Sequence, residues 1–210
     1  IPSLQYSYQF DEDLQQDWNW SEKYSAQPEI LEYLNHVADR FDLRKDIEFS
    51  TEVISARFNE GKSLWEIKTS QGEIETKFCV MATGCLSAPN TPDFKGLDDY
   101  EGQFLHTGKW PQTPVDFTGE SVAIIGTGSS SIQSIPVIAE QAKHLYVFQR
   151  TANYSIPSNN GPMDPTEEAE VKSRYPEFRK ENWENGFGIA GMAIEEMAVE
   201  DDEQGRKEKF

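Results

Sequence analysis

A glycine-rich loop in the middle of the chain has the residue types and the spacing of a phosphate-binding loop. Residues 121–133 read SVAIIGTGSSSIQ, in which Gly126 and Gly128 follow directly on a run of small apolar residues. The first glycine permits a tight turn, and the second lets the backbone approach a pyrophosphate. The third glycine position holds Ser131, which is small enough to let a helix pack closely on a strand. The pattern therefore predicts a dinucleotide-binding site.

The elements that must position this loop form one βαβ unit. We expect a buried strand over residues 121–126, a helix over 129–143 and a second strand over 145–150. The start of the helix would offer free N–H groups to phosphates, and Ser129 and Ser130 are expected to cap it. This context makes the glycine pattern much more specific than it would be alone. The candidate nucleotide-binding residues of the loop and helix start are Gly126, Thr127, Gly128, Ser129, Ser130 and Gln133.

The end of the second strand indicates which dinucleotide the loop binds. An NAD site carries an acidic residue about 20 residues beyond the loop, where it accepts from the ribose 2′-OH. Here the chain reads Gln149-Arg150-Thr151, with no acidic residue beside it. A guanidinium binds a 2′-phosphate through paired charge-assisted hydrogen bonds, whereas an acid would repel it. We therefore predict NADP(H), with Arg150 and Thr151 on the 2′-phosphate; the alternative is a solvated arginine at a strand end.

Three short segments ahead of the loop predict an antiparallel meander. Residues 47–58 and 64–69 alternate between apolar and polar types, and Gln71-Gly72 is typical of a hairpin turn. The third segment, residues 73–83, becomes increasingly apolar, so this strand is expected to enter the core. The proline-rich stretch that follows it reads as a linker.

The two ends of the chain carry different signals. Residues 1–27 are aromatic and polar without a clear period, so we expect extended or loop structure there. Apolar residues then recur at helical spacing and predict a helix over residues 28–41. Residues 164–210 are acidic and only weakly apolar, which predicts helices with a solvated charged face.

Bulk composition excludes several functional classes. The chain has 210 residues and a formal net charge of −18, so phosphates of nucleic acid or of an anionic membrane would be repelled. No apolar run has the roughly 18 residues that a membrane span needs. Cys79 and Cys85 are the only cysteines, and no Cys/His cluster exists, which argues against a metal site or a dithiol redox motif. A disulfide between the two cysteines is the alternative, but a reduced, cytoplasmic chain is favoured.

A motif in the linker carries a resemblance to a known family. Residues 100–111 read YEGQFLHTGKWP, which resembles the F-x-G-x-x-x-H-x-x-x-W-P fingerprint of Baeyer–Villiger monooxygenases, with Gly102, His106 and Trp110-Pro111 matching. Tyr100 stands where the family has Phe. The resemblance extends over about residues 4–165. Further stretches that carry it are WSEKYSAQPEILEYLNHVADRFDLR, VMATGCLSAPNTPDFKGL, PVDFTGESVAIIGTGSSSIQ and VFQRT.

The resemblance implies an α/β flavoprotein with two dinucleotide-binding domains, a Rossmann-like NADP domain and an FAD domain that carries the meander. It implies that this chain is a piece of such a protein, lacking the first FAD loop and the downstream catalytic arginine. The domains implied are part of the FAD-binding domain over 1–84, an inter-domain linker with the fingerprint over 85–119, the first part of the NADP domain over 120–163, and a truncated helical insertion over 164–210.

The activity that the resemblance implies is a Baeyer–Villiger oxidation. NADPH would reduce FAD, the reduced flavin would capture O₂ as a C4a-peroxyflavin, and one oxygen atom would enter next to a ketone carbonyl to give an ester or lactone. The piece itself would be inactive. Alternatives are a flavin monooxygenase that oxygenates soft nitrogen or sulfur, and a noncatalytic NADP-binding module. A disulfide reductase is disfavoured because the closely spaced cysteine pair of that class is missing.

The resemblance also implies roles for residues outside the loop. Val53 fits a strand position that meets the FAD adenine, although a core role is an equal alternative, and Thr83-Gly84 would lie at the crossing between the two domains. His106 and Trp110 would have a conformational role and not a catalytic one. The aromatic residues near the N-terminus would flank the flavin, but each is expected to be a core residue rather than a cofactor contact; they are Tyr6, Tyr8, Trp18 and Trp20.

Overall fold

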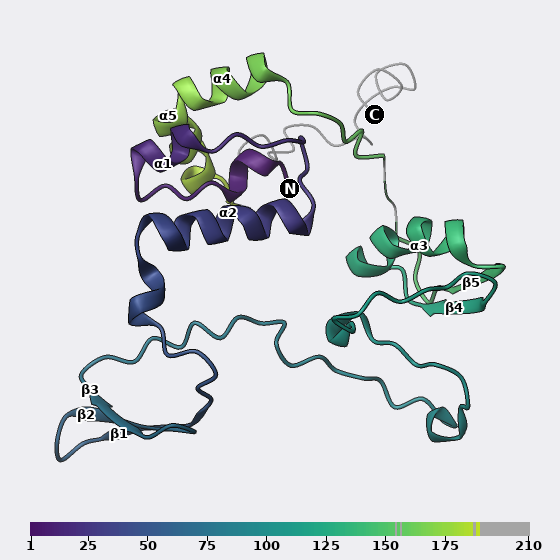
Figure 1. Ribbon diagram of the computed structural model, residues 1–210, viewed down its shortest axis with the longest axis horizontal. Coiled ribbons are helices and arrows are strands. Elements are labelled where there is room, and N and C mark those ends of the chain that lie inside the picture. Colours follow the sequence, from purple (N-terminus) through teal and green to yellow (C-terminus); the bar gives the residue numbers. More distant parts are fainter. Residues whose placement is uncertain (154, 156, 187, 190–210) are drawn as a thin grey trace. The chain divides into compact units, whose positions relative to one another are not determined.

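The computed structural model describes residues 1–153, 155, 157–186 and 188–189, which belong to two compact units (Figure 1). The first unit joins Ile1–Phe49 to the chain from Ser158 onward, and the second comprises Ser50–Pro157. The part of the predicted C-terminal helical segment over 190–210 lies outside the described residues. None of the described helices is long and apolar enough to cross a membrane.

The first unit is helical, and its longest element confirms the helix predicted over residues 28–41. Helix α2 (Gln27–Arg40) begins with Pro28 in its first turn, where the missing N–H costs nothing, and it buries Tyr33 and Val37. Helices α4 (Pro165–Ser173) and α5 (Tyr175–Glu184) complete the unit. Their packing closes a core made of Leu4, Leu14, Trp20, Tyr33, Val37 and Tyr175.

The expectation of loop structure over residues 1–27 is wrong for one segment. Helix α1 (Glu12–Asp17) begins after Asp11, whose carboxylate accepts from the Leu14 N–H at 2.7 Å. Such a cap satisfies one of the free N–H groups at a helix start. Leu14 has no exposed surface, so tertiary burial stabilises a helix too short to show a period in the sequence. A short 3₁₀ turn, Ser3–Tyr6, precedes it.

The N-terminal aromatic residues contribute to the core, as the sequence favoured. Trp20 is 2% exposed, and its indole N–H donates to the Ser7 hydroxyl at 3.0 Å. The Trp20 ring lies 5.2 Å from that of Tyr33 and 5.9 Å from that of Trp18, both in tilted or edge contacts that aromatic pairs prefer. Tyr8 differs from the others because 43% of its surface remains exposed.

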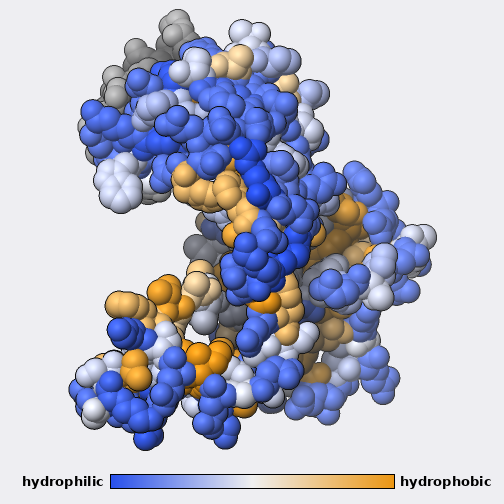
Figure 2. All heavy atoms as spheres, turned by 60° about the vertical axis from the view of Figure 1, so that its left-hand side comes forward, coloured by the Kyte–Doolittle hydropathy of each residue, from blue (hydrophilic) through white to orange (hydrophobic). Residues whose placement is uncertain are grey.

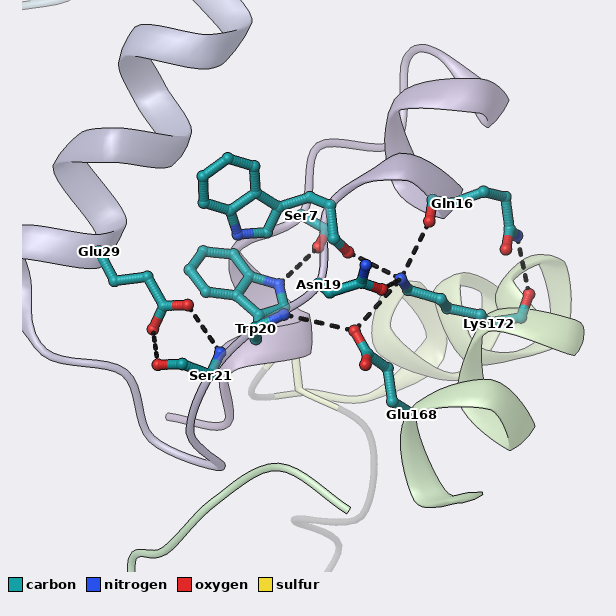
Figure 3. A network of polar contacts seen from close by, with 9 residues as sticks. Ser7, Gln16, Asn19, Trp20, Ser21, Glu29, Glu168 and Lys172 are labelled. Atoms are coloured by element: carbon teal, nitrogen blue, oxygen red, sulfur yellow. Dashed lines mark hydrogen bonds and ion pairs between the residues drawn. The ribbon is translucent and has the colours of Figure 1, made fainter. Parts of the chain in front are cut away.

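The acidic C-terminal helices do not present only a solvated face, which corrects the prediction for this segment. Glu168 and Lys172 of α4 are both 9% exposed and pair at 3.2 Å (Figure 3). The Lys172 ammonium also donates to the backbone carbonyls of Gln16 and Trp18, at 3.0 and 2.7 Å, and to the Asn19 side chain at 2.7 Å. The buried positions of α4 are therefore charged, which explains why the sequence shows no apolar stripe.

The second unit begins with the predicted antiparallel meander. Strands β1 (Val53–Asn59), β2 (Leu64–Thr69) and β3 (Glu73–Thr76) pair in chain order. The prediction is confirmed for the order and for the hairpin turn. It is wrong for the ends, because β1 begins later and β3 ends earlier than expected.

The apolar run after β3 does not enter a core. Phe78, Val80 and Met81 are 82%, 88% and 62% exposed, and apolar side chains lie at the surface in Figure 2. A run of this kind forms a buried strand only where neighbouring strands and a covering layer receive it. Among the described residues, no strand pairs with this run.

The predicted βαβ unit is confirmed in element order and type. Strands β4 (Ser121–Ile125) and β5 (His144–Phe148) are parallel, with Ala123 opposite Tyr146, and α3 (Ser129–Gln141) connects them. The description of the first strand as buried is wrong, since Ile125 is 62% exposed. A strand of a parallel sheet is buried only when layers cover both faces, and here α3 is the element connecting the pair.

Candidate nucleotide-binding site

The glycine loop leaves β4 through a conformation that favours glycine. Gly126 has φ +102°, in the left-handed region where a side chain would be strained. Its N–H donates to the Phe148 carbonyl at 2.8 Å, so the start of the loop is tied to the end of β5. A Cβ added at Gly126 or Gly128 would meet nothing within 4 Å, which means that the space above both glycines is open.

The start of α3 carries donors that the described part of the chain leaves unpaired. Gly128 is the N-cap, and no described acceptor takes the backbone N–H groups of Gly128, Ser129 or Ser130. The helix begins at Ser129 as expected, but the capping role predicted for the two serines is wrong, because Gly128 is the N-cap, no side chain caps the helix and both serines lie in its first turn. Ser131 is buried at 9% exposure, as expected for the residue in the third glycine position. Free N–H groups at a helix start, beside an open space, suit an anion.

Thr127, between the two glycines, is held by two side-chain amides. The Gln149 amide donates to the Thr127 hydroxyl at 2.8 Å, and the Asn153 amide donates to the Thr127 carbonyl at 2.7 Å and to its hydroxyl at 3.3 Å. Sequence reasoning did not identify Gln149 or Asn153 as part of the site. The available signal was the presence of two amides in the short stretch directly after β5.

The predicted 2′-phosphate residues lie just beyond β5. Arg150 and Thr151 are both exposed, and no described carboxylate lies within ion-pair distance of Arg150. In a chain with 37 acidic and 19 basic residues, an arginine beside an N–H-rich loop without an acidic partner is well placed for an anion. Gln133 turns toward its own helix, since its amide donates to the Ser129 carbonyl at 2.8 Å.

The linker histidine, His106, makes hydrogen bonds to two backbone groups of the linker. The His106 Nδ1 accepts from the Gly108 N–H at 3.0 Å, and its Nε2 lies 3.2 Å from the Asn90 carbonyl. These two partners together require a neutral ring with the proton on Nε2. Trp110 is 40% exposed, and its ring lies 6.2 Å from that of the buried Phe117. Both residues therefore shape the linker, and among the described residues neither contacts a catalytic partner.

Replacing Gly108 with alanine should disturb this histidine contact. A Cβ there would lie 2.8 Å from the Pro89 Cβ and 3.2 Å from the His106 Nδ1, so Pro89 must shift and the His106 ring must give by a few tenths of an ångström. Overpacking of this kind costs about 1–3 kcal/mol. Chemical denaturation should report that loss, and the His106 ring resonances should shift. Gly61→Ala is the matched control, because its Cβ would meet only Asn59 at 3.4 Å; an equal loss in both variants would contradict the prediction.

The candidate FAD residues are accessible, and no hydrogen bond or ion pair between described residues joins them to the loop. Val53 begins β1 and is 61% exposed, and its place at the FAD adenine stays a prediction. Thr83 and Gly84 are exposed, and Gly84 has φ +67°. No group of three or more His, Cys, Asp or Glu side chains within the described ranges could hold a metal ion. Cys79 and Cys85 are both free thiols.

A hollow of about 640 Å³ lies in the first unit and carries no comparable chemistry. Arg179 lines it and donates to the carbonyls of Ser7 and Leu4, at 2.6 and 3.3 Å. Burial lowers the pKa of Arg179 from its ordinary value. Because the guanidinium is turned onto backbone carbonyls, its role is to anchor α5 on the N-terminal segment.

Comparisons with known proteins agree with this geometry. The pyridine nucleotide-disulphide oxidoreductase family matches residues 8–197. A Baeyer-Villiger monooxygenase of Pseudooceanicola batsensis is 48% identical over 174 residues, covering 82% of this chain and 32% of that protein. Cyclohexanone 1,2-monooxygenase of an Acinetobacter species is 42% identical over 171 residues, covering 81% and 31%. The structure of an oxidized steroid monooxygenase bound to NADP superposes with a TM-score of 0.86 at 52% identity, covering 99% of this chain and 40% of that one. The chain thus spans about a third of the length of the curated relatives that it matches.

Proposed function

This chain belongs to the pyridine nucleotide-disulphide oxidoreductase family, and on that premise we propose that it is part of an FAD- and NADPH-dependent Baeyer–Villiger monooxygenase. The observation that carries the proposal is the likeness, over nearly the whole chain, to a monooxygenase solved with NADP. That likeness includes the glycine loop and the linker with His106 and Trp110. The substrates proposed are a ketone and O₂, and the product is an ester or lactone.

The residues present fit the phosphates of NADP. The unpaired N–H groups of Gly128, Ser129 and Ser130 would receive the pyrophosphate in the open space above the loop. The Arg150 guanidinium would bind the 2′-phosphate, with the Thr151 hydroxyl beside it. For FAD, the accessible Val53 and the Thr83-Gly84 backbone are the residues that we propose.

The two cofactors, when bound, supply the hydride and the activation of O₂. What this chain supplies is placement: the loop and Arg150 fix the adenosine half of NADP, and the His106 ring holds the linker in one conformation through Asn90 and Gly108. The domain boundaries at residues 84, 119 and 163 stay a prediction. A cytoplasmic location is also proposed, and the two free thiols support it.

The test uses the natural protein that carries this chain, loaded with FAD. It receives NADPH, oxygen and cyclohexanone, and a parallel tube receives a thioether in place of the ketone. We expect lactone by mass spectrometry, and no lactone when NADPH is omitted. Sulfoxide without lactone or ester from any of several ketones would overturn the proposal in favour of a nitrogen- or sulfur-oxygenating enzyme. Nucleotide binding without any oxygenated product would leave only an NADP-binding module.

A further inference from the structure

We propose that Gln149 and Asn153 are positioning residues of the nucleotide site, an inference that rests on the proposed binding of NADP. Their two amides flank the Arg150-Thr151 segment in the sequence, and both donate to Thr127. Through that one residue they fix the spacing between the pyrophosphate loop and the segment that receives the 2′-phosphate. We refer to this arrangement as the amide clamp.

The Thr127 hydroxyl is already engaged as an acceptor. Its oxygen accepts from Gln149 at 2.8 Å and from Asn153 at 3.3 Å, which occupies both acceptor positions of the oxygen. The hydroxyl proton must therefore point away from both amides and seek an acceptor elsewhere. A phosphate oxygen of a bound dinucleotide is such an acceptor. The clamp thus turns an ordinary threonine into a donor aimed at the ligand.

Asn153 also orients the peptide between Thr127 and Gly128. Asn153 holds the carbonyl of this peptide at 2.7 Å, and the structure contains no cis peptide among its described residues. In a planar trans peptide the C=O and the N–H point in opposite directions. Fixing the carbonyl on Asn153 therefore directs the Gly128 N–H away from that side, where no described acceptor takes it.

The clamp also limits the flexibility of the loop at Thr127. A threonine between two glycines has a mobile backbone, because glycine has more conformations to lose on ordering than any other residue. Holding it in the binding conformation before the ligand arrives removes that cost from the binding step. Each hydrogen bond of this kind contributes about 0.5–1.5 kcal/mol net, or about 2- to 13-fold in a dissociation constant.

The experiment measures NADP⁺ affinity by calorimetry on the FAD-loaded natural protein. Gln149→Ala and Asn153→Ala should each weaken NADP⁺ by about 3- to 10-fold. Each change is then repeated in a Thr127→Val background. There Gln149→Ala should have no further effect, because its contact was to the lost hydroxyl. Asn153→Ala should keep part of its effect, because the Thr127 carbonyl remains. In a Thr127→Ser background, which retains the hydroxyl, Gln149→Ala should again weaken NADP⁺ binding.

Gln71→Ala is the matched control, an exposed glutamine on the β2–β3 hairpin, and it should leave NADP⁺ affinity unchanged. Losses that persist in full in the Thr127→Val background, or no loss in the single variants, would overturn the clamp. A wild-type protein that bound NADP⁺ no better than NAD⁺ would instead overturn the proposed function, so the two failures are distinguishable.

Discussion

Arg150→Ala should weaken NADPH binding by about 10- to 150-fold, while NADH binding changes by less than about twofold. A hydrogen bond to a charged group contributes about 1.5–3 kcal/mol, which corresponds to that range. The guanidinium is exposed directly after β5 and has no described acidic partner. Its removal should therefore lower the affinity for the ligand without lowering the stability of the fold. Equilibrium titration of both nucleotides, followed by nicotinamide fluorescence, gives the two dissociation constants.

Two variants control this result. Arg150→Lys keeps the charge but loses the paired geometry, so it should fall between wild type and alanine. Arg57→Ala removes an exposed arginine from the meander and should change the affinity for neither NADPH nor NADH. Equal weakening of NADPH and NADH in Arg150→Ala would remove the 2′-phosphate assignment, because only NADPH carries that group.

Lys172→Met should destabilise the first unit by about 3–5 kcal/mol. The substitution leaves the Glu168 carboxylate buried at 9% exposure without its cation, which is the costly way to break a buried ion pair. It also removes the donor to the Gln16 and Trp18 carbonyls. Chemical denaturation followed by tryptophan fluorescence should report the loss, because Trp18 and Trp20 lie in this unit.

A second substitution distinguishes the ion pair from simple packing. Adding Glu168→Leu to Lys172→Met should recover a large part of the loss, because no buried charge then remains unpaired. Lys180→Met is the matched control: Lys180 and its partner Glu184 are 73% and 65% exposed, and such pairs contribute at most about 1 kcal/mol. A loss in Lys172→Met no larger than in Lys180→Met would contradict the prediction.

The sequence predicted those elements whose signal is local. The βαβ unit around Gly126 carries its strands, its turn and its helix start within 30 consecutive residues, and all of these elements formed. Helix α1 was missed because its stability comes from the Asp11 cap and from burial of Leu14, and neither leaves a period in six residues. The acidic helices were misjudged for a related reason. Glu168 and Lys172 read as solvated charges, and only their mutual pairing allows them to be buried.

For the site, the sequence supplied the residues with a known chemical pattern and missed the ones that hold them. Glycines before a helix and an arginine after a strand belong to a pattern that can be read along the chain. The amides of Gln149 and Asn153 are recognisable only once β5 ends beside Thr127. The serine cap failed although the helix begins at Ser129 as predicted, because Gly128 takes the N-cap position and no side chain caps the helix.

The contacts of Lys172 also set an order of events during synthesis. Its ammonium meets the Trp18 carbonyl across 154 residues of chain. A ribosome that adds about 5–20 residues per second needs about 8–30 s to make that stretch. Until α4 is made, the aromatic surface around Trp20 is without the helix that covers it, whereas the β4–α3–β5 unit has all its parts once Phe148 has been added. The β4–α3–β5 unit can therefore fold before the first unit is complete.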